Sequence, residues 1–216
     1  IKKALLLLLG TAGIVLVNMT PARWWSILLS CILAVILFQS PSIELGLVYW
    51  TLSMVLHYTV LFGTFMKGGF KEYWIRNSRT KEDAHRKFEA WLSFAFFHNG
   101  LAFSYLYFTT MSREDFAFAP ASWILVIGIT FQLIGFIIKF LATWQIGLSI
   151  YYYKDMFVEE KVIDFEGNGI FKFMSNPLYG WGQLNGYGAA LLAFSWHGIL
   201  ANVVNQLCFY SFYYSL

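Results

Sequence analysis

The sequence predicts an all-α integral membrane protein, and three observations support that fold class. The chain of 216 residues is 58% hydrophobic and only 12% charged, whereas a soluble domain carries roughly 25% charged residues. Several apolar stretches approach about 20 residues, the length that crosses the hydrocarbon core as a helix. No stretch alternates apolar and polar residues in the way that a half-buried strand does.

We expect about seven transmembrane helices, within a range of roughly five to seven, because the first two apolar segments are short. The four prolines each lie at a proposed boundary, and proline in the first helical turn loses no hydrogen bond. The candidate segments are residues 4–19, 24–39, 43–66, 89–110, 121–143, 176–195 and 197–215.

Positive charge is distributed unequally between the loops, which predicts the orientation of the chain. Eleven Lys and Arg residues fall on one side of the predicted membrane, seven of them in the loop 67–88, and three fall on the other. Cytoplasmic loops carry the excess of these residues. We therefore expect a multi-pass protein of the endoplasmic reticulum or the bacterial inner membrane, with the segment 144–175 and the C-terminus in the cytosol.

The loop 67–88 also mixes basic and aromatic side chains. Phe70, Tyr73 and Trp74 lie among its lysines and arginines, a pattern typical of an interfacial segment that touches anionic lipid headgroups. The alternative interpretation is an ordinary cytosolic loop with aromatic anchors, which the charge rule alone predicts.

Polar side chains inside apolar segments are expensive and mark candidate functional positions. His57 and His98 are each expected to hydrogen-bond a neighbouring helix, with catalysis as the alternative role. Lys139 lies near the cytosolic end of its segment, so its ammonium group can reach the interface. Gln132, Gly135 and Lys139 share one helix face, which indicates a contact with another helix.

Polar and small residues concentrate near the start of the last hairpin. Tyr179, Gln183 and Gly186 share one face of the predicted helix 176–195, and Gly182 and Gly186 have the GxxxG spacing of a close helix contact. The preceding residues 145–166 contain three tyrosines and five acids. Carboxylates can bond ribose hydroxyls, and aromatic rings can stack on a base and attract a cation. This cluster of polar, acidic and aromatic residues therefore suits the binding of a cofactor that carries a nucleoside and a positive charge.

Other chemistries lack their sequence signatures. The chain has no GxSxG nucleophile elbow and no P-loop. Its histidines and cysteines do not have zinc-binding spacing, and no basic tract indicates a nucleic-acid partner. We therefore expect neither a metal nor a nucleic acid.

The stretch from Gly167 to Trp181 resembles the membrane methyltransferases that use S-adenosylmethionine, which include phosphatidylethanolamine N-methyltransferases and isoprenylcysteine carboxyl methyltransferases. The family pattern is a glycine and an aromatic residue, then His-Pro or Asn-Pro, a tyrosine and a glycine. The matching positions are Gly169, Phe171, Asn176, Pro177, Tyr179 and Gly180. Upstream, Gly147, Asp155 and Phe157 match a second family segment, and the resemblance covers roughly residues 140–215.

The resemblance implies a role for the chain and for its residues. Residues 131–216 would form a methyltransferase-like core whose C-terminal helical hairpin carries the cofactor site, and residues 1–130 would be N-terminal membrane helices of unassigned role. The acceptor would be a membrane lipid, most simply the amine headgroup of a phospholipid such as phosphatidylethanolamine. Asp155, Glu159 and Glu160 are the candidate catalytic bases. The candidate cofactor-binding residues are Gly147, Gly169, Asn176, Pro177, Tyr179, Gly180 and Gln183.

Three alternatives stay open at this point. An isoprenylcysteine carboxyl methyltransferase would bind an anionic acceptor, and the motif segment offers no arginine for it. A sterol-type reductase would bind NADPH, whose 2'-phosphate requires clustered basic residues. A transporter or another non-enzymatic membrane protein would bind no nucleoside cofactor.

Overall fold

The computed structural model describes residues 2–16, 19–159, 168–174 and 176–215, which contain helices and no strand. This confirms the all-α class for the part of the chain described. The α-helices are α1 (Lys2–Thr11), α2 (Pro21–Gln39), α3 (Ile43–Phe65), α4 (Phe70–Arg76), α5 (Lys81–Thr109), α6 (Ala121–Ile146), α7 (Leu148–Tyr151), α8 (Leu184–Leu192) and α9 (Trp196–Ser215). Short helical turns lie at Glu114–Phe116, Asp155–Glu159, Gly169–Lys172 and Trp181–Gln183.

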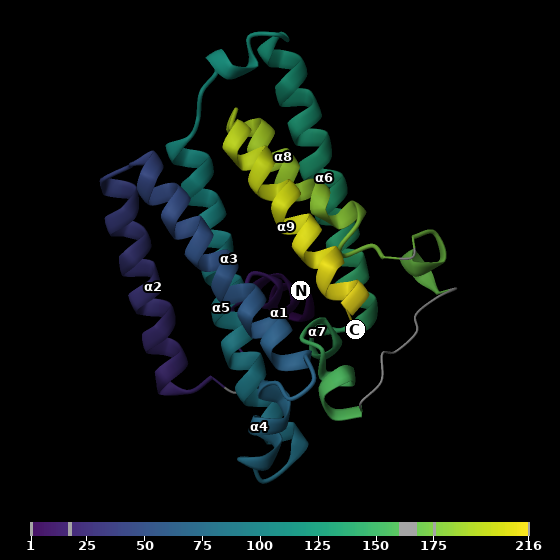
Figure 1. Cartoon of the computed structure of the whole chain (residues 1–216). Helices are drawn as coiled ribbons and strands as arrows, with labels where there is room; N and C mark the ends of the chain where they lie inside the picture. The colour runs from purple at the N-terminus through teal and green to yellow at the C-terminus, as the bar shows by residue number, and fades with distance from the viewer. Residues whose placement is uncertain (1, 17–18, 160–167, 175, 216) are drawn as a thin grey trace.

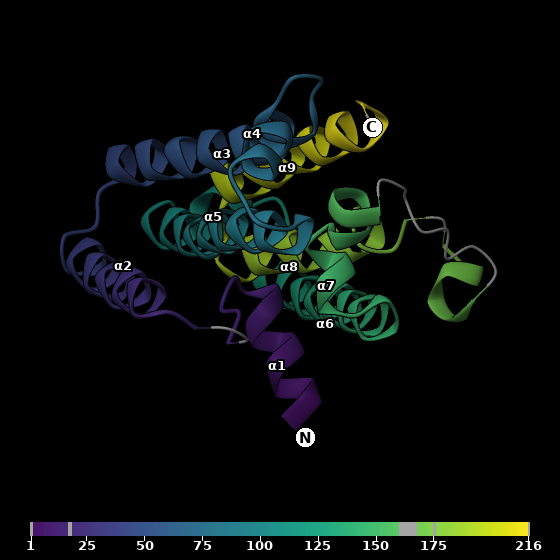
Figure 2. The same cartoon turned by 90° about the horizontal axis from the view of Figure 1, so that it is seen from below.

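The long helices form a bundle in which α2 lies at one edge and α6 at the other (Figure 1). Helix α5 packs against α2, α3 and α9, whereas α8 lies between α6 and α9. Helix α1 contacts α6 and α7 and projects from the side of the bundle with the N-terminus outermost, as the second view shows (Figure 2). Residues from both halves of the chain therefore enclose the same interior.

Local sequence explains where the long helices begin. The hydroxyl oxygens of Thr20, Ser42 and Thr80 accept hydrogen bonds from backbone N–H groups in the first turns of α2, α3 and α5, which satisfies donors that a helix start leaves unpaired. Pro21 follows its cap at the first helical position, and Pro120 precedes α6. The predicted starts at residues 24, 43 and 121 are confirmed to within three residues, whereas α5 begins eight residues before the predicted start at residue 89.

Among the residues that the structure describes, two helices, α3 and α6, are long and apolar enough to cross a membrane. Their outward faces carry exposed large apolar side chains, such as Leu52 on α3 and Val126 and Leu133 on α6. Contiguous exposed apolar surface of this kind indicates contact with lipid or a partner, and it agrees with membrane association. The count of seven spans stays a prediction.

Two predicted helices are shorter than expected. Helix α1 ends at Thr11, because the chain turns at Gly13 with a positive φ of 85°. The predicted helix 176–195 is broken, since residues 177–180 form turns and α8 begins only at Leu184. With a rise of about 1.5 Å per residue, neither α1 nor α8 alone reaches across a core about 30 Å thick.

Glycines bring α6 and α8 into backbone contact. A Cβ added at Gly135 would overlap the backbone nitrogen of Asn185, and one at Gly188 would overlap that of Gln132. The predicted helix contact through Gln132 and Gly135 is therefore confirmed. Of the predicted GxxxG pair, Gly186 faces the Asn202 side chain of α9 instead of a helix backbone.

The basic loop lies over the segment that follows α7. Lys71 Nζ donates to the Met156 carbonyl at 2.9 Å, and His85 Nε2 lies 3.0 Å from the Tyr152 carbonyl. Phe157 is fully buried and stacks on Phe88 with ring centroids 5.5 Å apart. The loop thus fixes the segment 152–157, while Tyr73 stays exposed on its outer side.

Candidate functional site

The Asn-Pro-Leu-Tyr-Gly motif forms a tight turn that points Tyr179 into the bundle. Asn176 Oδ1 accepts a hydrogen bond from Tyr179 N at 3.1 Å, and the Asn176 carbonyl accepts one from Gly180 N at 2.9 Å. A Cβ at Gly180 would lie 2.8 Å from that carbonyl, so a glycine allows the turn to close. Pro177 is fully buried, which anchors the turn against α6.

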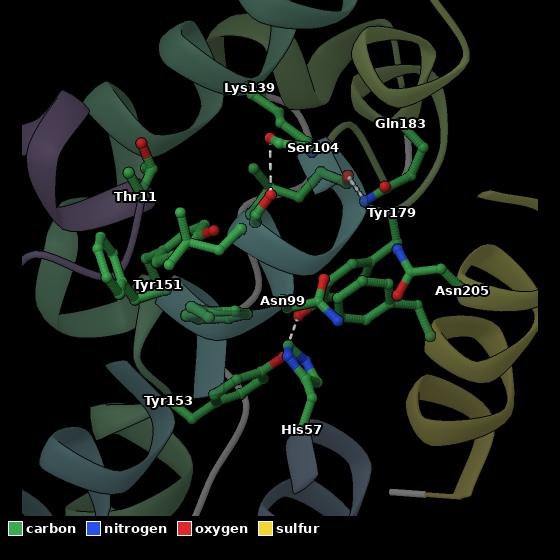
Figure 3. A pocket seen from close by; sticks show the side chains of 17 residues that line it. Thr11, His57, Asn99, Ser104, Lys139, Tyr151, Tyr153, Tyr179, Gln183 and Asn205 are labelled. Carbon is green, nitrogen blue, oxygen red and sulfur yellow. Dashed lines mark hydrogen bonds between the residues drawn. The ribbon is translucent and has the colours of Figure 1, made fainter. Parts of the chain in front are cut away.

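Tyr179 lies on a cavity of about 380 Å³ that is lined by residues of α1, α3, α5, α6, α7 and α9 and of the segments around Tyr153 and Tyr179. Figure 3 shows the polar side chains at this cavity: Thr11 from α1, His57 from α3, Asn99 and Ser104 from α5, Lys139 from α6, Tyr151 from α7, Asn205 from α9, and Tyr153, Tyr179 and Gln183 from the short turns and connecting segments. Its volume lies within the range of roughly 300–1,000 Å³ that is usual for small-molecule sites. Apolar walls with a few convergent polar groups also fit such a site.

Aromatic and amide contacts fix the motif side of the cavity. The Tyr179 ring stacks on Phe209 of α9 with centroids 5.0 Å apart and planes 21° apart. Its hydroxyl is hydrogen-bonded to that of Tyr153. Gln183 Nε2 donates to the Leu178 carbonyl at 3.0 Å, so the amide spans the turn and faces the cavity. Tyr179 and Gln183 both line this cavity, although a turn and not the predicted regular helix brings them together. Their role in cofactor binding stays a prediction.

Tyr153 has an unusual backbone conformation, with a positive φ of 57°. For a bulky L-residue this left-handed conformation costs about 1–3 kcal/mol and tends to occur at functional sites. The conformation directs the ring toward Tyr179. Burial raises the pKa of the Tyr153 hydroxyl well above its usual range, so the group is a neutral hydrogen-bonding partner at physiological pH.

The other predicted cofactor residues surround the motif turn without lining this cavity. Asn176 and Gly180 line a second, open pocket of about 780 Å³ together with Trp181, Tyr187 and Tyr210. Tyr179 and Gln183 therefore line the first cavity and Asn176 and Gly180 the second pocket, whereas Gly147, Gly169 and Pro177 line neither.

Gly147 and Gly169 have conformational roles in the segments that lead to the motif. Gly147 ends α6 with φ of 81° and ψ of 160°, a region that is essentially restricted to glycine. Gly169 has φ of 51°, and a Cβ there would overlap the Gln145 side chain. That side chain binds the loop from both directions: Nε2 donates to the Asn168 carbonyl at 2.9 Å, and Oε1 accepts from Ile170 N at 3.2 Å.

The predicted catalytic carboxylates do not line the cavity among the residues described. Asp155 is buried in the single turn Asp155–Glu159 and lies within electrostatic range of Tyr179. Glu159 is exposed at the end of that turn, and Glu160 lies outside the described residues. Their roles as bases stay a prediction.

Apart from the alternative catalytic role weighed for His57, sequence reasoning gave no site role to the polar residues that α3, α5 and α9 contribute. His57, Asn99 and Asn205 are polar residues in apolar segments, and that is the signal the sequence offers for them. The two predicted intramembrane histidines also differ. His98 bonds Ser30 Oγ at 2.9 Å and Tyr49 OH at 2.7 Å, which confirms the predicted helix contacts, whereas the same prediction for His57 is wrong, because neither of its ring nitrogens has a partner among the described residues.

Fold and site together describe a membrane-associated helical protein with a cavity that is lined by a few convergent polar groups and by the C-terminal Asn-Pro motif turn. Residues 123–215 match the family model of phospholipid methyltransferases. This match confirms the resemblance to the membrane methyltransferase family, and it covers all but the first two residues of α6 and the whole of α9. Comparison with curated proteins and with solved structures gave no match.

Proposed function

We propose that the chain transfers a methyl group from S-adenosylmethionine to a membrane lipid, with the amine headgroup of a phospholipid such as phosphatidylethanolamine as the acceptor. The observation that carries this proposal is the cavity at Tyr179, because it joins the family-matched motif to a hollow of ligand size. The match supports methyl transfer as the chemistry, and the specific lipid is our inference.

The cavity residues fit the proposed cofactor. Tyr151, Tyr179 and Phe96 offer aromatic surfaces, which can stack on a base and attract a cation. Lys139 has no ion-pair or hydrogen-bond partner among the described residues, so its ammonium group can bind a carboxylate. When bound, S-adenosylmethionine would supply an electrophilic methyl group on a positively charged sulfur. The chain's part is to hold the acceptor and the methyl group in close alignment and to exclude water.

Lys139 also bears on the choice of acceptor. A phospholipid headgroup carries a phosphate beside its amine, and the lysine can pair with either that phosphate or the cofactor's carboxylate. The same cation would suit the carboxylate of a prenylated cysteine, which makes the isoprenylcysteine reaction the second candidate. The phospholipid reaction is favoured because the matching family model describes phospholipid methyltransferases.

The proposed topology is a multi-pass protein with the site open to the cytosol, where S-adenosylmethionine is found. The hydrogen bond from Lys71 to the Met156 carbonyl supports this arrangement, because it keeps the basic loop and the segment after α7 at the same end of the bundle. The exposed basic residues of that loop would contact anionic lipid headgroups.

The test is a binding and transfer assay on the protein purified in lipid nanodiscs. We expect S-adenosylmethionine and S-adenosylhomocysteine to bind, NADPH not to bind, and radiolabelled methyl groups to appear on phosphatidylethanolamine and not on a prenylcysteine. Binding of NADPH alone would refute the methyltransferase proposal. Methylation of the prenylcysteine alone would assign the second candidate.

A variant at Lys139 tests how the cavity recognises its ligand. Lys139→Met keeps the apolar stem of the side chain and removes the charge. We expect it to weaken binding of S-adenosylhomocysteine about 10-fold or more if the lysine holds the cofactor's carboxylate, since a hydrogen bond to a charged group is worth about 1.5–3 kcal/mol. If the lysine holds the lipid phosphate, cofactor binding stays unchanged and the KM for the phospholipid rises instead. If neither the affinity for S-adenosylhomocysteine nor the KM for the phospholipid changes, Lys139 does not contact either ligand.

A further inference from the structure

His57 differs from the other buried histidines of the described chain. His85 and His98 have hydrogen-bond partners, on the Tyr152 carbonyl and on Ser30 and Tyr49 respectively. His57 is 1% exposed, and both of its ring nitrogens are without a partner among the described residues. Buried polar groups are nearly always hydrogen-bonded. Two unsatisfied ring nitrogens therefore indicate that a bound ligand supplies the missing hydrogen-bond partner.

Packing holds this imidazole at the wall of the cavity. Its ring lies between Phe96 of α5, at a centroid distance of 4.8 Å, and Phe209 of α9, at 5.5 Å. Phe209 is also the ring on which Tyr179 stacks. His57 lines the cavity and points toward the region where the hydroxyls of Tyr153 and Tyr179 meet (Figure 3). A ligand held by the motif would therefore reach the unpaired ring nitrogens.

We propose that His57 is the catalytic proton acceptor of the methyl acceptor's amine, an inference that rests on the proposed function. A primary amine with a pKa near 10 is an ammonium ion at neutral pH, and it has no lone pair for attack until a proton leaves. The described lining of the cavity contains no carboxylate. His57 is the imidazole in that lining, and imidazole is the side chain most often used for this task.

The proton transfer balances within the cavity. One ammonium N–H bond breaks, an N–H bond forms on an imidazole nitrogen, and the pair of electrons left on the amine nitrogen becomes available to the methyl carbon. The positive charge moves from substrate to His57, so the net charge of the cavity does not change, which limits the penalty of a buried site. The proton then passes to water as the products leave.

The surroundings of His57 contain few competing ionisable groups. Tyr58 follows it on α3, and its hydroxyl donates to Asn205 Oδ1 at 2.9 Å. Helix α5 presents Phe96 and Asn99, and α9 presents Asn205 and Phe209. The remaining titratable groups in the described lining are Lys139 and the hydroxyls of Tyr151, Tyr153 and Tyr179. A charged Lys139 acts similarly on the substrate ammonium and on a protonated His57, so it leaves the transfer between them nearly unaffected.

This assignment gives a role to helices outside the family match. His57 and Asn99 belong to α3 and α5, which precede residue 123, the start of the matched region. The motif side would hold the cofactor, and the N-terminal side would activate the acceptor.

The test compares His57→Gln with His98→Gln in nanodiscs that contain phosphatidylethanolamine. We expect His57→Gln to bind S-adenosylhomocysteine within about threefold of wild type and to lose about 10²–10⁴-fold in methyl transfer at pH 7, the usual contribution of a general base. Its rate should recover as pH rises toward the amine's own pKa, whereas the pH profile of His98→Gln should follow that of wild type.

Three results would overturn the assignment. His57→Gln could transfer methyl groups at a wild-type rate throughout the pH range. It could lose cofactor binding together with transfer, which would make His57 a cofactor ligand. Alternatively, Asp155→Asn could reproduce the predicted pH profile, which would return the role to the carboxylate. A wild-type protein that binds no sulfur nucleotide is a separate result and refutes the proposed function itself.

A further variant gives a readout that does not depend on activity. His57→Phe removes the unsatisfied nitrogens and keeps an aromatic ring between Phe96 and Phe209. We expect its unfolding temperature to equal the wild-type value or to exceed it by about 2–4 °C, the usual change for 1 kcal/mol in a chain of this length. A fall of more than about 5 °C would show that the imidazole stabilises the fold, and it would contradict the proposal.

Discussion

The contact between α6 and α8 predicts a graded response when helical glycines are replaced by alanine. Gly100→Ala, Gly128→Ala and Gly135→Ala each add one methyl group to a helix interior. Near Gly100 the added Cβ meets nothing within 4 Å. Near Gly128 it lies 3.1 Å from the movable Leu192 side chain and 3.3 Å from the Gly188 carbonyl, and at Gly135 it overlaps the backbone of Asn185. The three sites therefore differ mainly in the neighbour that the methyl group meets.

The magnitudes follow from two terms. Each substitution gains about 0.8–1 kcal/mol of helix propensity relative to glycine. At Gly135 the overlap with backbone adds an overpacking penalty of about 1–3 kcal/mol, because a helix backbone cannot rotate away as a side chain can. Gly100→Ala should therefore raise the free energy of unfolding. Because the propensity gain is the same in all three variants, it cancels when they are compared. The free energy of unfolding of Gly135→Ala should therefore be about 1–3 kcal/mol lower than that of Gly100→Ala, and that of Gly128→Ala should lie between them.

Thermal unfolding in detergent micelles, followed by tryptophan fluorescence, measures this order. With about 2–4 °C for each kcal/mol in a chain of this length, the unfolding temperatures of Gly100→Ala and Gly135→Ala should differ by about 2–12 °C. Equal unfolding temperatures for the three variants would refute the backbone contact between α6 and α8.

Two further predictions concern the segments around the site. Gly147→Ala forces a Cβ into a glycine-only conformation without any steric contact, so it should destabilise the protein by about 1–3 kcal/mol in the same unfolding assay, and an unchanged stability would contradict the positive φ. Burial lowers the pKa of His85, so the unfolded chain binds the extra proton first, and stability should fall as pH drops below about 6.5. Urea unfolding at pH 5.5 and 7.5 should show this loss in wild type and a smaller loss in His85→Gln; an equal loss in both would assign it to other groups.

The sequence predicted the helical class and several helix starts because those features depend on local chemistry. Thr20 and Ser42 cap α2 and α3 through hydrogen bonds within the first helical turn, and Pro21 follows its cap directly. Such contacts do not depend on the rest of the fold. The family resemblance was likewise local, since it rests on the short motif from Gly169 to Gly180. The match to residues 123–215 confirms it.

The composition of the cavity could not be predicted in the same way. Tyr179 meets Tyr153 and Phe209 through contacts between distant parts of the chain. In apolar helices, faces toward lipid and faces toward the interior have the same residue types, so periodicity does not tell them apart. The sequence also missed the break before α8, because Pro177 is compatible with a first helical turn and Gly182 and Gly186 with a helix contact, so neither pattern indicates the turn.

The division of the cavity between matched and unmatched helices has a consequence for how such enzymes can diversify. If the wall from α3 and α5 selects and activates the acceptor, exchange of the first 110 residues between two relatives should change the lipid that is modified while the nucleotide affinity stays the same. The matched region would then supply the methyl group whichever N-terminal helices precede it. Those helices would determine which molecules of the bilayer reach it.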